Sequence, residues 1–278
     1  MNTALVLTAL DCFRATLTLV GIGMVLSSLE FMSLHKHFLS GGLYSWEALK
    51  MRRQLETDRP ISALAAVLFE REAFLLVLAT RLGAALSIVA YGAIGIIHLP
   101  SIAVALTTQL LFSYRNSIGG DGSDQMTSVV LVATFLYALN PGNPISREAC
   151  LWFLALQSCL AYTASGAAKL YSKKWRAGTA LFEILNTRTY GTRVAASFFK
   201  VRPSLSKWLS YSVMACQLSF VLALLLPWPW NAVYLIWGLS FHCGIALLMG
   251  LNLFPFPFSA CYPAVIYCSF RIQGLPVG

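Results

Sequence analysis

Long apolar runs alternate with short polar connections along most of this chain. The apolar segments cover residues 4–32, 73–97, 99–114, 126–140, 149–171, 208–228 and 231–256, and a weaker apolar tail follows at 259–270. Several runs approach or exceed the roughly 18 residues that suggest a membrane-spanning helix. The pattern predicts an all-α fold, a polytopic integral membrane helical bundle of about seven apolar segments. The third and fourth segments are short, so we expect them to tilt or to be buried inside the bundle.

Composition agrees with a lipid environment. The chain is 58% hydrophobic and only 11% charged, whereas soluble domains are about 25% charged. No internal repeat or soluble domain is visible, so we predict one membrane domain over residues 1–278. The first segment lacks a preceding basic stretch and a following small-residue cleavage site, so we expect it to be retained as a helix. The seven cysteines show no paired spacing, so neither a metal site nor a disulfide framework is predicted.

The net charge of +9 has a topological explanation and does not predict nucleic-acid binding. Basic residues concentrate in the connections 33–72 and 172–207, where they set topology and meet anionic lipid headgroups. With seven spans, both connections fall on one face of the membrane. The positive-inside rule predicts that this face is cytoplasmic, with the N-terminus outside.

Ionisable residues inside the apolar segments are the first candidates for function, because they are costly in lipid. Asp11 and Arg14, three residues apart in the first segment, could form a structural ion pair or belong to a site. Arg81, near the start of the second segment, could extend to the headgroups. His242 lies deep in the last full segment and is either a satisfied core residue or a group for proton transfer.

The stretch NSIGGDGSDQ, residues 116–125, joins the third and fourth segments. In one interpretation it is a polar turn, whose glycines adopt positive φ and whose aspartates bind nearby backbone. In the other, its polar groups line a cavity at membrane depth. The candidates for binding a cofactor or substrate there are Asp121, Asp124 and Gln125.

Lys169 follows a run of small residues in YTASGAAKLYSKKWRAGTAL, residues 162–181. Tyr162, Ser165, Gly166 and Lys169 share one side of a helix, and Gly166 would let another helix approach closely. Lysine near a helix end can simply extend to the headgroups. In a tight, partly desolvated groove it could instead act as a base.

This stretch resembles the motif of the horizontally transferred transmembrane (HTTM) domain, the superfamily of the vitamin K-dependent gamma-carboxylases and their bacterial relatives. The motif falls on Tyr162, Ser165-Gly166, Lys169-Leu170, Trp175 and Gly178. Two further stretches agree in the expected order. LDCFR, with Arg14, is similar to the family's opening Leu-x-x-Phe-Arg, and SFHCGIALLMGLNLF, with His242, is similar to its Phe-His helix.

The resemblance implies roles for these residues. Lys169 would be the catalytic base that deprotonates a reduced, vitamin K-like quinone, and His242 would assist proton handling or stabilise an oxyanion. Arg14 would order the polar cavity, and Tyr162 and Trp175 would belong to the cofactor- or substrate-binding region. Membrane lipid and a secreted peptide substrate with its maturation partners are the implied partners, in the bacterial cytoplasmic membrane.

The chain departs from the carboxylases in ways that bear on its activity. It has no histidine between His98 and His242, where the carboxylases carry one at the start of the fourth helix. Gly119, Gly120, Asp124 and Gln125 are closer to the Gly-Gly-acidic-Gln pattern of the sporulation-delaying-protein-B-like toxin-maturation relatives. The large propeptide-binding domain has no counterpart in these 278 residues. The family site opens to the exterior, whereas the charge pattern places the basic face beside Lys169 in the cytoplasm.

Two hypotheses follow. In the first, the protein is a membrane enzyme that uses Lys169 to abstract a proton, coupled to a lipid quinol or acting directly on a peptide or small substrate. In the second, it is a non-catalytic accessory protein for the maturation, export or immunity of a secreted peptide. A transporter is less favoured, because the sequence shows no inverted repeat and no pair of matching broken helices.

Overall fold

The computed structural model describes residues 7–38, 42, 44–53, 67–116 and 120–278. Within these ranges the chain forms helices and turns, with one isolated bridge between Leu7 and Val277. The all-α prediction is therefore confirmed for the described part of the chain. Gly119, from the predicted loop, lies outside the described residues, as do parts of the 33–72 connection.

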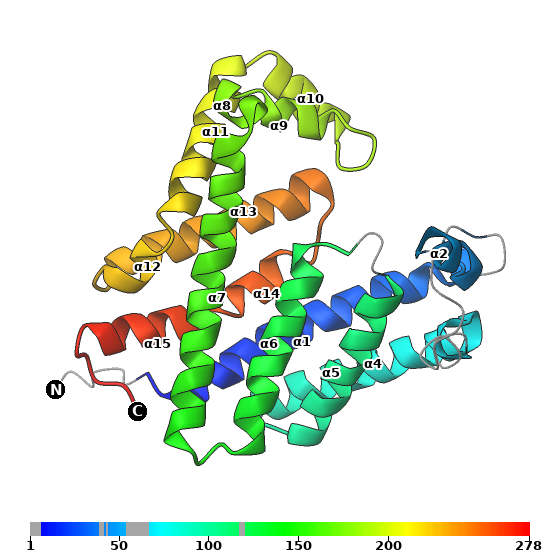
Figure 1. The fold of residues 1–278 in the computed structure, drawn as a ribbon, viewed down its shortest axis with the longest axis vertical. Coiled ribbons are helices and arrows are strands. Elements are labelled where there is room, and N and C mark those ends of the chain that lie inside the picture. The colour runs from blue at the N-terminus through cyan, green and yellow to red at the C-terminus, as the bar shows by residue number, and fades with distance from the viewer. Residues whose placement is uncertain (1–6, 39–41, 43, 54–66, 117–119) are drawn as a thin grey trace. The chain divides into compact units, whose positions relative to one another are not determined.

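The chain divides into two compact units (Figure 1). The first comprises the residues up to Thr16 together with Arg147–Gly278, and the second comprises Leu17–Ser146. Helix α1 (Ala9–Ser33) contributes residues to both units. The prediction of a single domain over the whole chain stays a prediction.

The second unit is built on three helices that pack in sequence order. After α1 come η1 (His35–Phe38), α2 (Trp46–Arg53), α4 (Arg71–Ala93), α5 (Leu99–Arg115) and α6 (Gly122–Leu139). Helix α5 packs against both α4 and α6. Pro100 occupies the first turn of α5, where its missing N–H costs no hydrogen bond.

The first unit contains the remaining helices. They are α7 (Pro144–Tyr171), α8 (Lys173–Ala177), α9 (Ala180–Leu185), α10 (Arg193–Lys200), α11 (Pro203–Leu218), α12 (Leu222–Leu225), α13 (Trp230–Met249), α14 (Pro255–Ser259) and α15 (Tyr262–Ile272). Gly178 and Gly250, with φ of 78° and 71°, end α8 and α13, a backbone conformation that glycine adopts at low cost. Short helices α8, α9 and α10 follow the C-terminal end of α7 (Figure 1).

Four helices of the described residues are long and apolar enough to cross a bilayer: α1, α4, α7 and α13. These four helices support the assignment as an integral membrane protein. They correspond to four of the seven predicted apolar segments. The predicted segment 208–228 is interrupted, because α11 ends at Leu218 and α12 begins at Leu222. Helix α5 has 17 residues, about 26 Å at 1.5 Å per residue, slightly less than the roughly 30 Å hydrocarbon core.

Candidate functional site

Helix α7 carries the motif YTASGAAKLY, and Gly166 within it packs against a second helix. A Cβ placed on Gly166 would lie 2.8 Å from the backbone nitrogen of Leu218 and 3.0 Å from Cβ of Gln217. Both belong to the end of α11. The prediction that Gly166 allows a close helix approach is therefore confirmed.

Lys169 lies in the last turn of α7 and is half-buried. Its Nζ donates to Oγ of Ser165, one turn earlier, at 2.6 Å, and lies 3.5 Å from the Ser165 carbonyl oxygen. The Nζ atom also lies 5.2 Å from the ring centroid of Trp175, within cation–π distance. Ser165 and Trp175 thus hold the amine at a defined position, and Trp175 lines the same cavity as Lys169.

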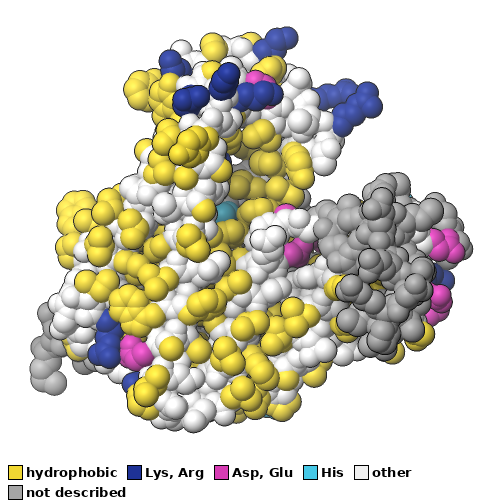
Figure 2. Space-filling view, viewed as in Figure 1, with side chains coloured by type: hydrophobic (Ala, Val, Ile, Leu, Met, Phe, Trp, Pro, Cys, Tyr) yellow, Lys and Arg dark blue, Asp and Glu magenta, His cyan; other side chains and the backbone are white. Residues whose placement is uncertain are grey.

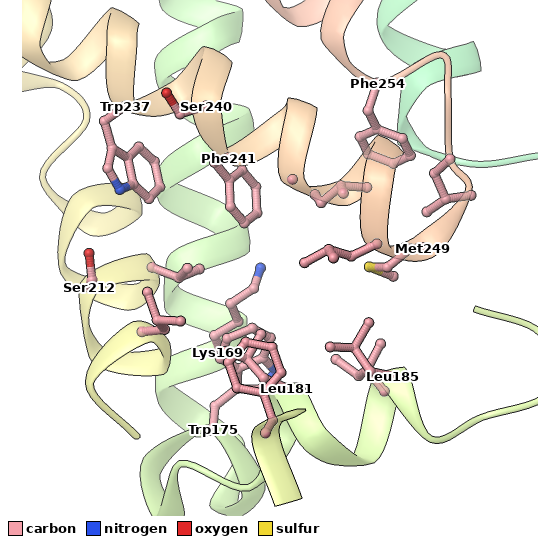
Figure 3. Close-up of a pocket in the computed structure, with 18 residues that line it drawn as sticks. Lys169, Trp175, Leu181, Leu185, Ser212, Trp237, Ser240, Phe241, Met249 and Phe254 are labelled. Atoms are coloured by element: carbon pink, nitrogen blue, oxygen red, sulfur yellow. The ribbon is translucent and has the colours of Figure 1, made fainter. Parts of the chain in front are cut away.

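The Lys169 amine faces an apolar cavity of about 470 Å³ within the first unit (Figure 3). Trp237 and Phe241 of α13 form one wall, and their rings stack with centroids 5.3 Å apart. Leu181 and Leu185 of α9 line the cavity elsewhere. Besides Lys169, the polar side chains at the wall are the Trp indoles and two serine hydroxyls, those of Ser212 and Ser240.

A hydrogen-bonded network of aromatic residues joins α7, α13 and α15 in the same unit. The Tyr162 hydroxyl is 2.7 Å from Nε2 of His242 and 2.7 Å from the Tyr262 hydroxyl. The Tyr162 ring stacks on Phe220, with centroids 3.8 Å apart. Gly238 makes room for this network, since a Cβ there would lie 2.8 Å from the Tyr162 hydroxyl and closer still to that of Tyr262.

His242 lies behind the cavity wall. Its ring packs on Phe258 at 4.3 Å and on Phe254 at 5.8 Å between centroids, and Phe254 lines the cavity. The side chain is buried, and Nδ1 has no hydrogen-bond partner among the described residues. The geometry makes His242 a neighbour of the cavity, in contact with Tyr162 and with the cavity-lining Phe254.

Arg14 forms the ion pair that is one of the two alternatives proposed for it. Its Nη1 lies 3.4 Å from Oδ1 of Asp11, so the ion pair predicted at this spacing is confirmed. The residues that line the cavity do not include Arg14.

Asp121, Asp124 and Gln125 belong to the second unit, at the start of α6. The predicted connection over residues 116–125 is too long, because α6 begins at Gly122. The Asp121 carboxylate caps this helix by accepting from the backbone N–H groups of Ser123 at 2.8 Å and Asp124 at 3.3 Å, the arrangement expected of an N-cap. Gln125 is exposed. The polar-turn interpretation is thus confirmed for Asp121.

Arg81 does not extend to the surface, contrary to the sequence-based expectation. It is 1% exposed, and its Nε and Nη2 donate to Oε1 of Gln109 at 3.2 and 2.7 Å. Its Nη1 donates to Ser28 Oγ at 2.7 Å and to the Met24 carbonyl at 3.2 Å. The expectation is wrong because helices α1 and α5 supply acceptors that replace water around the guanidinium.

Sequence reasoning missed Tyr262, Gly238 and two aromatic residues of the cavity wall, Trp237 and Phe241. Tyr262 is separated from Tyr162 by 100 residues, so no local pattern relates them. Gly238 could have been noticed as a small residue one helical turn before His242, the same feature that drew attention to Gly166. Trp237 and Phe241 are four residues apart. Aromatic pairs at this spacing are common in apolar helices, where they serve packing alone.

Comparisons of the chain with protein-family models, with curated proteins and with solved structures found no match.

Proposed function

We propose that this protein is an integral membrane enzyme of the vitamin K-dependent gamma-carboxylase-like superfamily, in which Lys169 is the general base. One observation carries the proposal: the Lys169 amine faces an apolar cavity of about 470 Å³. Small-molecule sites have volumes of about 300–1,000 Å³ and combine apolar walls with a few placed polar groups. The proposed location is the bacterial cytoplasmic membrane.

A reduced quinone is the cofactor or substrate that we propose for this cavity. Trp237 and Phe241 offer aromatic faces to a flat ring. Leu209 and Leu248, which line the cavity, are 39% and 40% exposed, so an isoprenoid chain could leave the cavity toward lipid. The Lys169 amine, which faces the cavity (Figure 3), can hydrogen-bond a quinone oxygen. The residues present therefore fit a quinol.

The roles of the protein groups follow from their positions. Ser165 orients Nζ of Lys169 through its hydroxyl, and in its neutral form the amine would accept a proton from a bound hydroxyl. Bound reduced quinone would supply the acidic hydroxyl and the electrons for a subsequent oxidation. Tyr162 and His242 are positioning residues, because their hydrogen bond fixes α13, which carries Trp237 and Phe241, against α7.

Titration of the purified protein with decylubiquinol tests this proposal. We expect binding to quench the fluorescence of Trp175 and Trp237, which line the cavity. We expect Lys169→Met to bind the quinol and to slow its oxidation by dissolved oxygen about 100-fold or more, the usual contribution of a general base. Lys173→Met is the matched control, since Lys173 is exposed at the start of α8.

Equal oxidation rates in the wild type and Lys169→Met would reject the role of Lys169 as base. Absence of quenching would reject the quinol. The accessory hypothesis, with a secreted peptide and its maturation machinery as partners, predicts that Lys169→Met retains full function in peptide maturation.

A further inference from the structure

The segment that follows α7 carries a large excess of positive charge. Residues 172–207 contain eight lysines and arginines, and Glu183 is their only acidic residue. All eight basic residues are exposed, and their side chains gather over α8–α11 at the top of Figure 2. Glu183 is already paired with Lys174. Most of this charge therefore has no partner within the segment.

Exposed apolar side chains lie among these charges on the outer face of α10 and on the residues after it. Val194, Phe198 and Val201 are 84%, 44% and 71% exposed. Their spacing of four and three residues places them on one side of the helix. Trp208, seven residues after Val201, is 73% exposed. The guanidinium carbon of Arg202 lies 4.3 Å from the ring centroid of Phe198.

This outer stripe is separate from the face that holds α10 in the fold. The inner face of α10 consists of Ala195, Ala196 and Phe199, which cluster with Leu185 of α9. Phe199 and Leu185 also line the cavity. An amphipathic helix needs only one apolar face for internal packing, so the second stripe has no role inside the unit.

We propose that the outer face of α10 and its C-terminal end, defined by Val194, Phe198, Val201 and Arg202, binds the headgroup layer of an anionic membrane together with the exposed cations Arg193 and Lys200 on its flanks. Basic residues near such a surface contribute about 1 kcal/mol each, and apolar side chains of interfacial helices enter the boundary between headgroups and acyl chains. Helix α7, long and apolar enough to span the bilayer, ends at Tyr171, and α8 begins two residues later. A spanning α7 would place the start of this segment at headgroup level.

Lipid binding at this face would also bear on the cavity. Phe198 of the outer face and Phe199 of the cavity wall are consecutive, with ring centroids 5.3 Å apart. Anionic lipid that immobilises α10 would hold Phe199 in the wall. The inference needs only the surface and holds whether or not the cavity binds a quinol.

Hydrogen–deuterium exchange of the full chain in nanodiscs tests the inference. One set of discs contains phosphatidylcholine alone, and the other contains one part phosphatidylglycerol to two parts phosphatidylcholine. We expect exchange over residues 193–202 to be about tenfold slower in the anionic discs, and the difference to be lost in high salt because screening weakens the attraction.

The variant Arg193→Gln/Lys200→Gln should lose most of the protection by anionic lipid. The matched control is Lys36→Gln/Arg71→Gln, which removes two cations from the second unit and should keep the protection. Equal exchange in both lipids, or equal loss in both variants, would overturn the inference. Protection that appears in neutral discs only when two copies share a disc would overturn it in favour of a second copy of this chain.

Discussion

Arg81 and Lys169 are both cations within predicted membrane helices, but their surroundings differ. Nε, Nη1 and Nη2 of Arg81 all donate hydrogen bonds to Gln109, Ser28 or Met24, and Phe112 covers the guanidinium carbon at 4.6 Å. Lys169 donates a hydrogen bond within its own helix, to Ser165, lies within cation–π distance of Trp175 and otherwise faces the cavity.

The difference separates a structural cation from a candidate catalytic one. A buried polar group with all its partners fixed stabilises one packing arrangement and has no capacity left for a ligand. An amine beside an open apolar volume keeps free hydrogen-bonding capacity. The surroundings of an intramembrane cation, and not its presence in an apolar run, therefore indicate its role.

The largest expected effect concerns Arg81. Replacing it by Met leaves Gln109 and Ser28 without their donors inside the second unit, so we expect Arg81→Met to lower the free energy of unfolding by about 2–4 kcal/mol. Lys169→Met should lower it by less than about 1 kcal/mol, because it removes one local hydrogen bond. Unfolding of both variants in detergent mixtures measures the difference. Similar losses of unfolding free energy in the two variants would contradict the distinction between a structural Arg81 and a candidate catalytic Lys169.

A second prediction concerns the aromatic network beside the cavity. In Gly238→Ala the new methyl group would contact the hydroxyls of Tyr162 and Tyr262, so we expect a loss of about 1–3 kcal/mol from overpacking. Gly244→Ala, on the same helix, meets nothing within 4 Å and should be neutral or slightly stabilising. Thermal unfolding of the two variants provides the comparison. A tolerated Gly238→Ala would show that the network is loosely packed.

Tyr262→Phe makes a smaller change at the same place. It removes the hydroxyl that bonds Tyr162 and leaves the ring in position, so we expect a loss of about 1 kcal/mol. If Tyr162 positions the cavity wall, the same variant should weaken decylubiquinol binding several-fold. Tyr234→Phe, which removes a hydroxyl bonded to Ser219, is the control for loss of a phenol. Equal effects of Tyr262→Phe and Tyr234→Phe on quinol binding would show that Tyr262 has no specific role at the cavity.

The smallest effect is expected at the exposed pair of Lys174 and Glu183. The hydrogen bond from Lys174 lowers the pKa of the Glu183 carboxyl. Because the folded pKa is below the unfolded one, the pair stabilises α9 above the unfolded pKa, and this contribution is lost as the pH falls through the folded pKa. We expect faster amide exchange in α9 between about pH 5 and pH 3, after correction for intrinsic rates. Glu183→Gln should abolish the pH dependence of amide exchange in α9. If the pH dependence is unchanged in this variant, another titrating group causes it.

The sequence by itself determined the lipid environment and the all-α class of this protein. Apolar runs of sufficient length predict helices in lipid because every backbone N–H and C=O must be satisfied within the segment. The sequence also predicted the ion pair of Asp11 with Arg14 and the close helix approach at Gly166, since each depends on local spacing. The start of α6 was placed too late because the polar residues of its first turn resemble a loop.

Only the tertiary structure decided which polar residues have partners and which face open volume. Burial of Arg81 depends on acceptors from α1 and α5, and the Tyr162 network depends on residues 80 and 100 positions away. The cavity beside Lys169 likewise arises from helices distant in sequence. Hydropathy reports the cost of moving each residue into lipid, whereas the partner that offsets this cost comes from packing between helices, which no local pattern encodes.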